Sequence, residues 1–215
     1  MTNIRSLAEA PSPVWAPTLF DSEPVAPDPA FRGAQRIALR HDAWIEYVPG
    51  WLRGAAAVYE DLAANVPWRS GKRLMYGRFV DEPRLHAHDR VAVEHCPVAG
   101  PVIDAMAGLL SHRYGLVLAN VGLNLYRDGD DSVAWHGDRV ARDRVQSTIA
   151  IVSVGGHRPF RLRPRSGGGG NTVELRLGGG DLLVMGGSCQ RTWYHCVPKV
   201  RQAPPRISVT FRPDW

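Results

Sequence analysis

The residues best suited to chemistry in this chain are His136 and Asp138, which stand one residue apart in NLYRDGDDSVAWHGDRV (124–140). On a β-strand, positions i and i+2 point to the same face, so the imidazole and the carboxylate would meet at one point. They would supply two of the three ligands of a facial metal site. The chain has eight His and 14 Asp, so on the order of one such pair is expected by chance. The simpler alternative is a solvated strand end.

A third candidate ligand is His195, in RTWYHCVP, which follows a Gly-rich turn and the apolar run DLLVMG. A jelly roll would bring this late strand beside the one that carries His136. Two His and one carboxylate with open positions suit non-haem Fe(II) and oxygen chemistry. We expect Cys196 to point away from this site, as strand neighbours do. The remaining histidines are interpreted as surface or ordinary hydrogen-bonding residues: His41, His86, His88, His95, His112 and His157.

Two arginines, Arg206 and Arg212, lie six residues apart in RISVTFR. The even spacing places both on one face of a strand, with Ser208 and Thr210 between them. Two inward guanidinium groups are costly to bury without anions, so a dicarboxylate bound between the strand and the metal is the physically sensible partner. The alternative is an exposed amphipathic strand.

Elements that must position these residues follow from the pattern of the chain. Helices are predicted over 51–64 and 101–114, the second with Pro101 at its start and Gly115 at its stop. After residue 115 the chain is rich in β-branched residues and interrupted by Gly clusters, which predicts a closed sandwich or jelly roll. The predicted strands are 116–126, 145–155, 159–164, 171–177, 181–186 and 206–212. Residues 73–80 are a further candidate strand or hairpin.

The composition fits one folded domain. Six of the 17 Pro fall in the first 29 residues, so we expect an extended arm over 1–34 and a single domain over 35–215. Three Cys without a C-x-x-C pair argue against a disulfide framework or a zinc ribbon and favour the cytoplasm. No stretch is long and apolar enough to predict a membrane span, and no export signal is visible. We expect a monomer.

The net charge of +5 is unevenly distributed. Residues 139–165 hold seven Arg against a single acid, Asp143, whereas residues 1–60 hold more acids than Arg. An anionic partner would therefore meet the second half of the chain.

With these residues in view, the sequence resembles the AlkB family of Fe(II)- and 2-oxoglutarate-dependent dioxygenases over about residues 73–212. The resemblance rests on N-x-Y (Asn124, Tyr126), H-x-D (His136, Asp138), the late His195 and the paired Arg206 and Arg212. It implies a mainly β (α+β) fold, a double-stranded β-helix of the jelly-roll, cupin-like type, with the N-terminal helices packed on the outside.

The resemblance also implies roles for these residues. Iron would be held by His136, Asp138 and His195, which are the catalytic set. The co-substrate 2-oxoglutarate would have Arg206 and Tyr126 at its distal carboxylate, and Arg212 and Asn124 nearer the metal; Ser208 stands where the family often has Asn. The implied activity is oxidative dealkylation of N-alkylated bases in DNA or RNA. O2 and 2-oxoglutarate are consumed, the alkyl group is hydroxylated, and an aldehyde is released.

The segment RSGKRLMYGRFVDEPRLHAHDR (69–90) resembles the substrate lid of the family. Basic side chains there would contact phosphates and aromatic ones would pack on a base. The residues assigned to substrate binding are Trp68, Arg73, Tyr76, Arg84, Trp135 and Arg161. The chain departs from the family where an aromatic pair is common, having His86-Ala87-His88-Asp89, and at Val140, where some members carry an acid.

These departures leave two alternatives open. One is a dioxygenase of the same fold that hydroxylates a protein or a small molecule. The other is a non-catalytic jelly-roll module that binds nucleic acid through its basic face.

Overall fold

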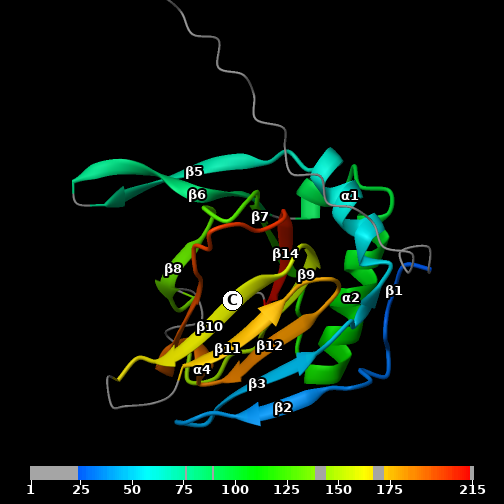
Figure 1. Ribbon diagram of the computed structural model, residues 1–215. Helices are drawn as coiled ribbons and strands as arrows, with labels where there is room; N and C mark the ends of the chain where they lie inside the picture. The colour runs from blue at the N-terminus through cyan, green and yellow to red at the C-terminus, as the bar shows by residue number, and fades with distance from the viewer. Residues whose placement is uncertain (1–23, 76, 89, 139–143, 167–171, 214–215) are drawn as a thin grey trace, which may run out of the picture.

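Two antiparallel sheets face each other in the computed structural model of the chain (Figure 1). The structure describes residues 24–213 except 76, 89, 139–143 and 167–171. Its strands are β1 (Ala26–Pro27), β2 (Gln35–Ala38), β3 (Ala43–Val48), β4 (Leu52–Arg53), β5 (Arg69–Met75), β6 (Arg78–His88), β7 (Asn120–Tyr126), β8 (Val133–His136), β9 (Ile149–Gly155), β10 (Arg158–Pro164), β11 (Val173–Leu177), β12 (Leu182–Gly187), β13 (Trp193–Val197) and β14 (Arg206–Arg212). The helices are α1 (Ala55–Asn65), α2 (Ala99–Tyr114), the short α4 (Cys189–Thr192) and the 3-10 turn η1 (Arg90–Val93).

The larger sheet has the order β2-β3-β12-β9-β14-β7-β6-β5, and the smaller has the order β11-β10-β13-β8. A separate pair joins β1 to β4. The predicted mainly β, jelly-roll class with outside helices is confirmed, because α1 and α2 cover the face of the larger sheet that turns away from the smaller one (Figure 1).

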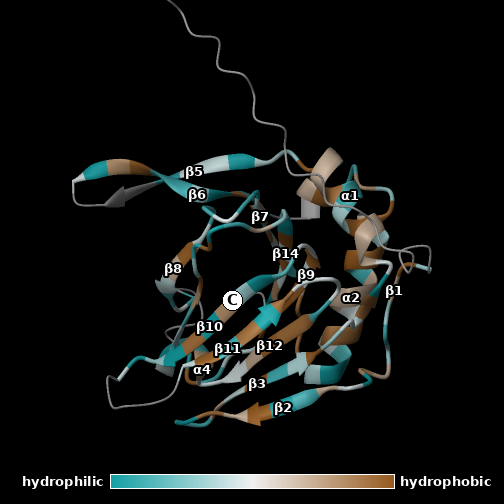
Figure 2. Cartoon of the chain, in the orientation of Figure 1, coloured by the Kyte–Doolittle hydropathy of each residue, from teal (hydrophilic) through white to brown (hydrophobic). Residues whose placement is uncertain are grey.

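Strand alternation separates two apolar cores. Figure 2 shows hydrophobic residues (brown) on α1, α2 and β12. On β12, Leu182 and Val184 pack with the helices, whereas Leu183 and Met185 face the smaller sheet. A strand with both faces covered reads as a continuous apolar run, as DLLVMG does. The core between the sheets forms the wall of the site described below.

Both predicted helices are present, and both starts are shifted: α2 begins at Ala99, two residues before Pro101. Helix α2 ends at Gly115, which adopts a left-handed φ of 67° as glycine does readily. Helix α1 begins at Ala55, not at residue 51, because β4 occupies the preceding residues and Gly54 turns the chain with a φ of 62°. Among the described residues, no helix is both long and apolar enough to cross a membrane.

The predicted boundary of the domain at residue 35 is late. Strand β1 pairs with β4, and Phe31 is buried against Trp51 with ring centroids 5.2 Å apart. Residues 24–34 therefore pack on the domain, which the Pro-rich composition of the N-terminal segment concealed. The rest of the predicted arm, residues 1–23, lies outside the described residues.

The hairpin predicted around residues 73–80 is present and longer than expected. Strands β5 and β6 pair with each other, and β6 also pairs with β7, so that one end of the hairpin belongs to the larger sheet. Its far end extends away from the body of the domain (Figure 1). The polar side of β6 thereby reaches the mouth of the space between the sheets.

Candidate active site

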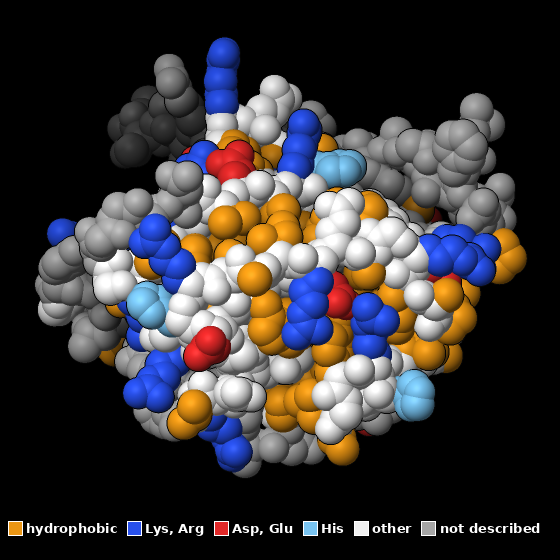
Figure 3. Space-filling view, turned by 90° about the horizontal axis from the view of Figure 1, so that it is seen from below, with side chains coloured by type: hydrophobic (Ala, Val, Ile, Leu, Met, Phe, Trp, Pro, Cys, Tyr) orange, Lys and Arg blue, Asp and Glu red, His pale blue; other side chains and the backbone are white. Residues whose placement is uncertain are grey.

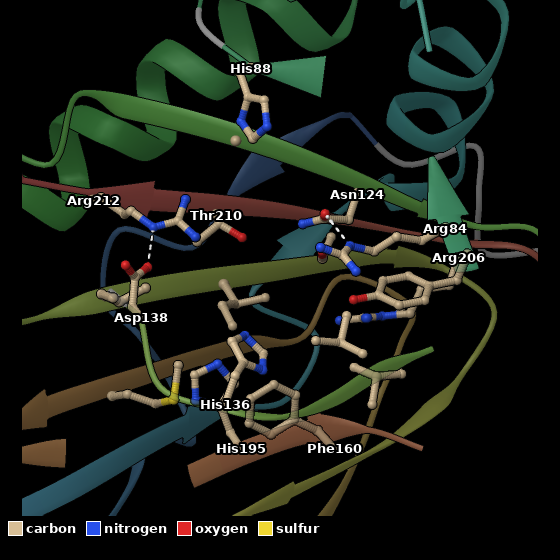
Figure 4. Close-up of a pocket in the computed structure, with 18 residues that line it drawn as sticks. Arg84, His88, Asn124, His136, Asp138, Phe160, His195, Arg206, Thr210 and Arg212 are labelled. Atoms are coloured by element: carbon tan, nitrogen blue, oxygen red, sulfur yellow. Dashed lines mark hydrogen bonds and ion pairs between the residues drawn. The ribbon is translucent and has the colours of Figure 1, made fainter. Parts of the chain in front are cut away.

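A pocket opens between the two sheets and is lined by all eight residues proposed above for metal and co-substrate (Figure 4). Strand β14 contributes alternate residues from Arg206 to Arg212, as its even spacing predicted, and β7 lies beside it. The smaller sheet supplies the histidines. The predicted residues that line the pocket are Asn124, Tyr126, His136, Asp138, His195, Arg206, Ser208 and Arg212.

The two candidate histidines lie side by side on paired strands. His136 on β8 is directly opposite His195 on β13, and their ring centroids are 4.2 Å apart. The ring of Phe160 stacks on His195 at 5.5 Å from the other side. The sheet register that the jelly roll required is therefore what brings these distant residues together.

Both imidazoles are suited to bind a cation. Burial lowers the pKa of His136, and burial together with neighbouring His136, Arg212 and Arg165 holds the pKa of His195 well below its usual range. Nδ1 of His136 lies 2.9 Å from the carbonyl oxygen of Ala134. A carbonyl only accepts, so Nδ1 carries the proton and Nε2 keeps its lone pair. Neutral imidazoles with an available nitrogen are the form that binds metal.

Asp138 departs from the prediction. Strand β8 ends at His136, so Asp138 follows the strand, and strand alternation alone does not place it. Its Oδ2 accepts a hydrogen bond from Nε of Arg212 at 2.5 Å, an ion pair that joins the two sheets (Figure 4). Within the described part of the chain, no three His, Cys, Asp or Glu side chains are grouped as a ligand set. Binding of one ion by all three groups requires the carboxylate to turn from Arg212 to the metal.

Arg206 is a cation buried at the inner end of the pocket. Only 1% of the residue is exposed, and burial lowers the pKa of its guanidinium. Its Nε donates to Ser153 Oγ at 2.6 Å, and the guanidinium lies 5.2 Å from the ring centroid of Tyr126. Among the described residues it has no carboxylate ion-pair partner. A buried guanidinium that lacks a carboxylate partner is suited to bind an anionic ligand.

The hairpin strand β6 contributes to the mouth of the pocket through Arg84 and His88. Nε of Arg84 donates to Asn124 Oδ1 at 3.0 Å, and its Nη2 forms an ion pair with Glu82 at 3.0 Å. His88 is exposed, as predicted, and it also lines the pocket, because it shares a strand face with Arg84. The proposed placement of Arg84 at the substrate end is consistent with this geometry.

Three residues assigned to substrate binding do not line the pocket. Trp68 packs against the helix-side core. Trp135 lies beneath the guanidinium of Arg163, whose Cζ is 4.3 Å from its ring. Arg161 pairs with Glu174 at 2.6 Å. Strand alternation turns Arg161 and Arg163 outward, because Phe160 and Leu162 occupy the core between the sheets.

Several residues named in the predictions lie outside the described part of the chain. Tyr76, Asp89 and Val140 lie outside the described residues, as do the side chain of Arg73 and most of the segment 139–144. Cys196 is buried and does not line the pocket, in line with its expected orientation.

Sequence reasoning did not single out the apolar wall of the pocket. Three of its members, Ile149, Ile151 and Met185, belong to strands β9 and β12, which are buried on both faces, so the local pattern does not show which residues reach the cavity. The whole wall consists of Val133, Ile149, Ile151, Phe160, Met185 and Val197.

The residues present fit a metal ion and a dicarboxylate. Two adjacent neutral imidazoles and a carboxylate line one pocket. The buried Arg206, which pairs with no acid of the described residues, lies on the larger sheet. Two His and one carboxylate would neutralise part of the charge of a divalent ion and leave coordination positions open. Fe(II) with 2-oxoglutarate matches this donor set.

Comparisons with known proteins agree with this geometry. The family model described as the 2OG-Fe(II) oxygenase superfamily matches residues 79–212. The solved structure of an oxidoreductase of the 2OG-Fe(II) oxygenase family from Burkholderia pseudomallei superimposes with a TM-score of 0.50 at 16% identity, covering 73% of this chain and 76% of that one. This likeness supports the fold.

Curated relatives are more similar in sequence. Alpha-ketoglutarate-dependent dioxygenase alkB homolog 3 is 32% identical in Bos taurus and 31% in Homo sapiens, over 76% of this chain and 64% of each relative. DNA oxidative demethylase ALKBH2 of Bos taurus is 32% identical over 52% of this chain and 43% of the relative. The chain thus spans about 64% of the length of the first relatives, and none of these names favours the two alternatives raised from the sequence.

Proposed function

The chain belongs to the AlkB family of the 2OG-Fe(II) oxygenase superfamily, and we propose that it is a dioxygenase that removes alkyl groups from N-alkylated bases in DNA or RNA. Its cofactor would be Fe(II), and its co-substrates 2-oxoglutarate and O2. The observation that carries the proposal is the pocket itself. It contains two neutral imidazoles, a carboxylate and the buried Arg206, which has no ion-pair partner in the described part of the chain.

Each protein group has a definite task in this proposal. His136, Asp138 and His195 would hold the iron. Once bound, it would supply the oxidation chemistry in which O2 and 2-oxoglutarate are consumed and the alkyl carbon is hydroxylated. Arg206 would clamp the distal carboxylate of 2-oxoglutarate as a charged fork, and the ring of Tyr126 would limit its motion.

The other residues of β7 and β14 would complete the co-substrate site. Asn124 and Arg212 would bind the metal-proximal end, and Ser208 lies between the two arginines on the pocket face. The apolar wall of the pocket would exclude water from the reacting alkyl group. Arg84 and His88 at the mouth would contact the substrate next to that group.

A polyanionic substrate is supported by charge on the outer face of the smaller sheet. Arg163 and Arg176 are exposed there, and the guanidinium of Arg165 lies 4.6 Å from the ring centroid of Tyr194. Arginines beside aromatic rings are suited to the phosphates and bases of a single strand. Basic side chains also show at more places than acidic ones on the face seen from below in Figure 3. A test of this surface therefore needs an arginine elsewhere as its control.

We predict that Arg163→Gln weakens binding of a single-stranded methylated oligonucleotide and reduces its salt dependence. Each lost phosphate contact should reduce the magnitude of the slope of log binding constant against log salt concentration by about 0.7. Fluorescence anisotropy at several salt concentrations measures this slope. The matched control is Arg36→Gln on edge strand β2, since Arg36 likewise lies over a ring, Trp44, at 3.7 Å. If Arg163→Gln left the salt dependence unchanged, or if Arg36→Gln reduced it equally, the outer face of the smaller sheet would not be part of the substrate-binding surface.

The proposal is tested by incubating the full chain with Fe(II), 2-oxoglutarate and oligonucleotides that carry methylated bases, single- and double-stranded. We expect mass spectrometry to show the unmodified base and a colorimetric assay to show formaldehyde. No restoration of any methylated base would refute the repair function. Consumption of 2-oxoglutarate stimulated only by a peptide or a small molecule would then favour the hydroxylase alternative.

We also propose that the protein acts as a monomer in the cytoplasm. All eight residues proposed for the metal and the co-substrate come from one chain, so the proposed site needs no residue of a second subunit. Cys96, Cys189 and Cys196 are all free, which supports a reducing compartment.

A further inference from the structure

We infer that Gln190, supported by Arg165, is a positioning residue that fixes the backbone of Asp138 for metal binding. The inference rests on the proposed function, because it concerns the proposed iron site. Strand β8 ends two residues before Asp138. His136 pairs with His195, but β8 ends there, so Asp138 is not held by a strand ladder.

Gln190 supplies the bond that the ladder lacks. It lies on α4, five residues before His195, and only 1% of it is exposed. Its Oε1 accepts a hydrogen bond from the backbone N–H of Asp138 at 3.0 Å, and its Nε2 lies 3.5 Å from Sδ of Met185 in the pocket wall. Both ends of the buried amide are engaged, so the side chain is fixed in one orientation.

Arg165 closes the other side of the turn. Its Nη2 donates to the backbone carbonyl of Gln190 at 2.9 Å, and its backbone N–H donates to the carbonyl of Thr192 at 2.9 Å. A Cβ added at Gly137 would lie 2.1 Å from Nη2 of Arg165 and 2.7 Å from the Gln190 carbonyl oxygen. The middle residue of H-x-D is therefore enclosed by Arg165 and Gln190, and only glycine fits there without a shift.

The backbone and the carboxylate of Asp138 are thus held by different elements. Gln190 of α4 accepts a hydrogen bond from its backbone N–H, while Arg212 of β14 holds its carboxylate. If the Asp138 carboxylate left Arg212 to bind a metal, only its side chain would have to move, because Gln190 already fixes its backbone. Outer groups of this kind typically change metal affinity by about 10- to 100-fold.

The experiment is a calorimetric titration of the metal-free full chain with Mn(II) alone. We expect Gln190→Met, which keeps the length and removes the acceptor, to weaken Mn(II) binding by about 10- to 100-fold. The matched control is Thr192→Val on the same short helix, whose hydroxyl bonds only to Ser188. It should bind Mn(II) as the wild type does, even if its unfolding midpoint falls.

The Mn(II) affinity of Arg165→Met is a second test, which does not require the replacement of a fully buried residue. Loss of a nearby cation should by electrostatics alone strengthen Mn(II) binding, so weaker binding in this variant identifies positioning as its role. Mn(II) affinity unchanged in Gln190→Met, or increased in Arg165→Met, would overturn the inference. A wild-type chain that binds no Mn(II) would instead refute the proposed metal site.

Discussion

Replacement of His136 by alanine should lower the rate of base restoration by at least about 10³-fold. The imidazole would supply one of only three protein ligands. Among the described residues, the one His that lines the pocket besides His136 and His195 is His88, which lies on the hairpin. The rate is measured with saturating oligonucleotide and 2-oxoglutarate over a range of Fe(II) concentrations. Excess Fe(II) should recover little activity, because the remaining groups cannot replace the lost ligand.

A histidine away from the site controls for general effects of the substitution. His112 is exposed on α2, and His112→Ala should keep wild-type activity. Metal-free His136→Ala should fold with a modest loss of stability, because the variant loses a ring that packs beside His195 but gains no unpaired charge. Full activity in His136→Ala would show that the metal assignment is wrong.

The second large effect is expected at the co-substrate. Arg206→Met should raise the KM for 2-oxoglutarate by about 100-fold, because loss of one partner of a buried charge pair costs about 2–5 kcal/mol. Steady-state rates at varied 2-oxoglutarate measure it. Arg206→Lys keeps the charge but loses the planar fork, so its KM should fall between those of wild type and Arg206→Met.

Stability separates this role from a structural one. Arg206 is buried and forms no ion pair with an acid among residues 24–213 that the structure describes, so its removal also removes a desolvation penalty. Urea unfolding of the ligand-free Arg206→Met variant should therefore show no loss of stability. A large loss of stability with an unchanged KM for 2-oxoglutarate would make Arg206 a structural residue.

The sheet content and the face of β14 could be predicted because both depend on local periodicity. The alternation of Arg206, Ser208 and Arg212 is intrinsic to a strand, and the pocket contains all three. The meeting of His136 and His195 needed a fold hypothesis as well, since 59 residues separate them and only the register of β8 and β13 joins them.

What could not be predicted depended on tertiary contacts. Strand geometry extends only to His136, so the ion pair of Asp138 with Arg212, which crosses between sheets, leaves no sign in the local pattern. Trp135 was expected at the substrate, but the arginine of a neighbouring strand covers its ring. The role inferred for Gln190 had no sequence signal, because a buried amide is distinguished by its partners alone.

The most direct measurement of the central claim is the stoichiometry of products formed from one methylated single-stranded oligonucleotide. Succinate, formaldehyde and restored base are quantified in the same reaction, with and without Fe(II). We predict one succinate and one formaldehyde for each restored base, with none of the three formed without iron. Restored base without succinate, or succinate that rises with the oligonucleotide while no base is restored, would contradict the account.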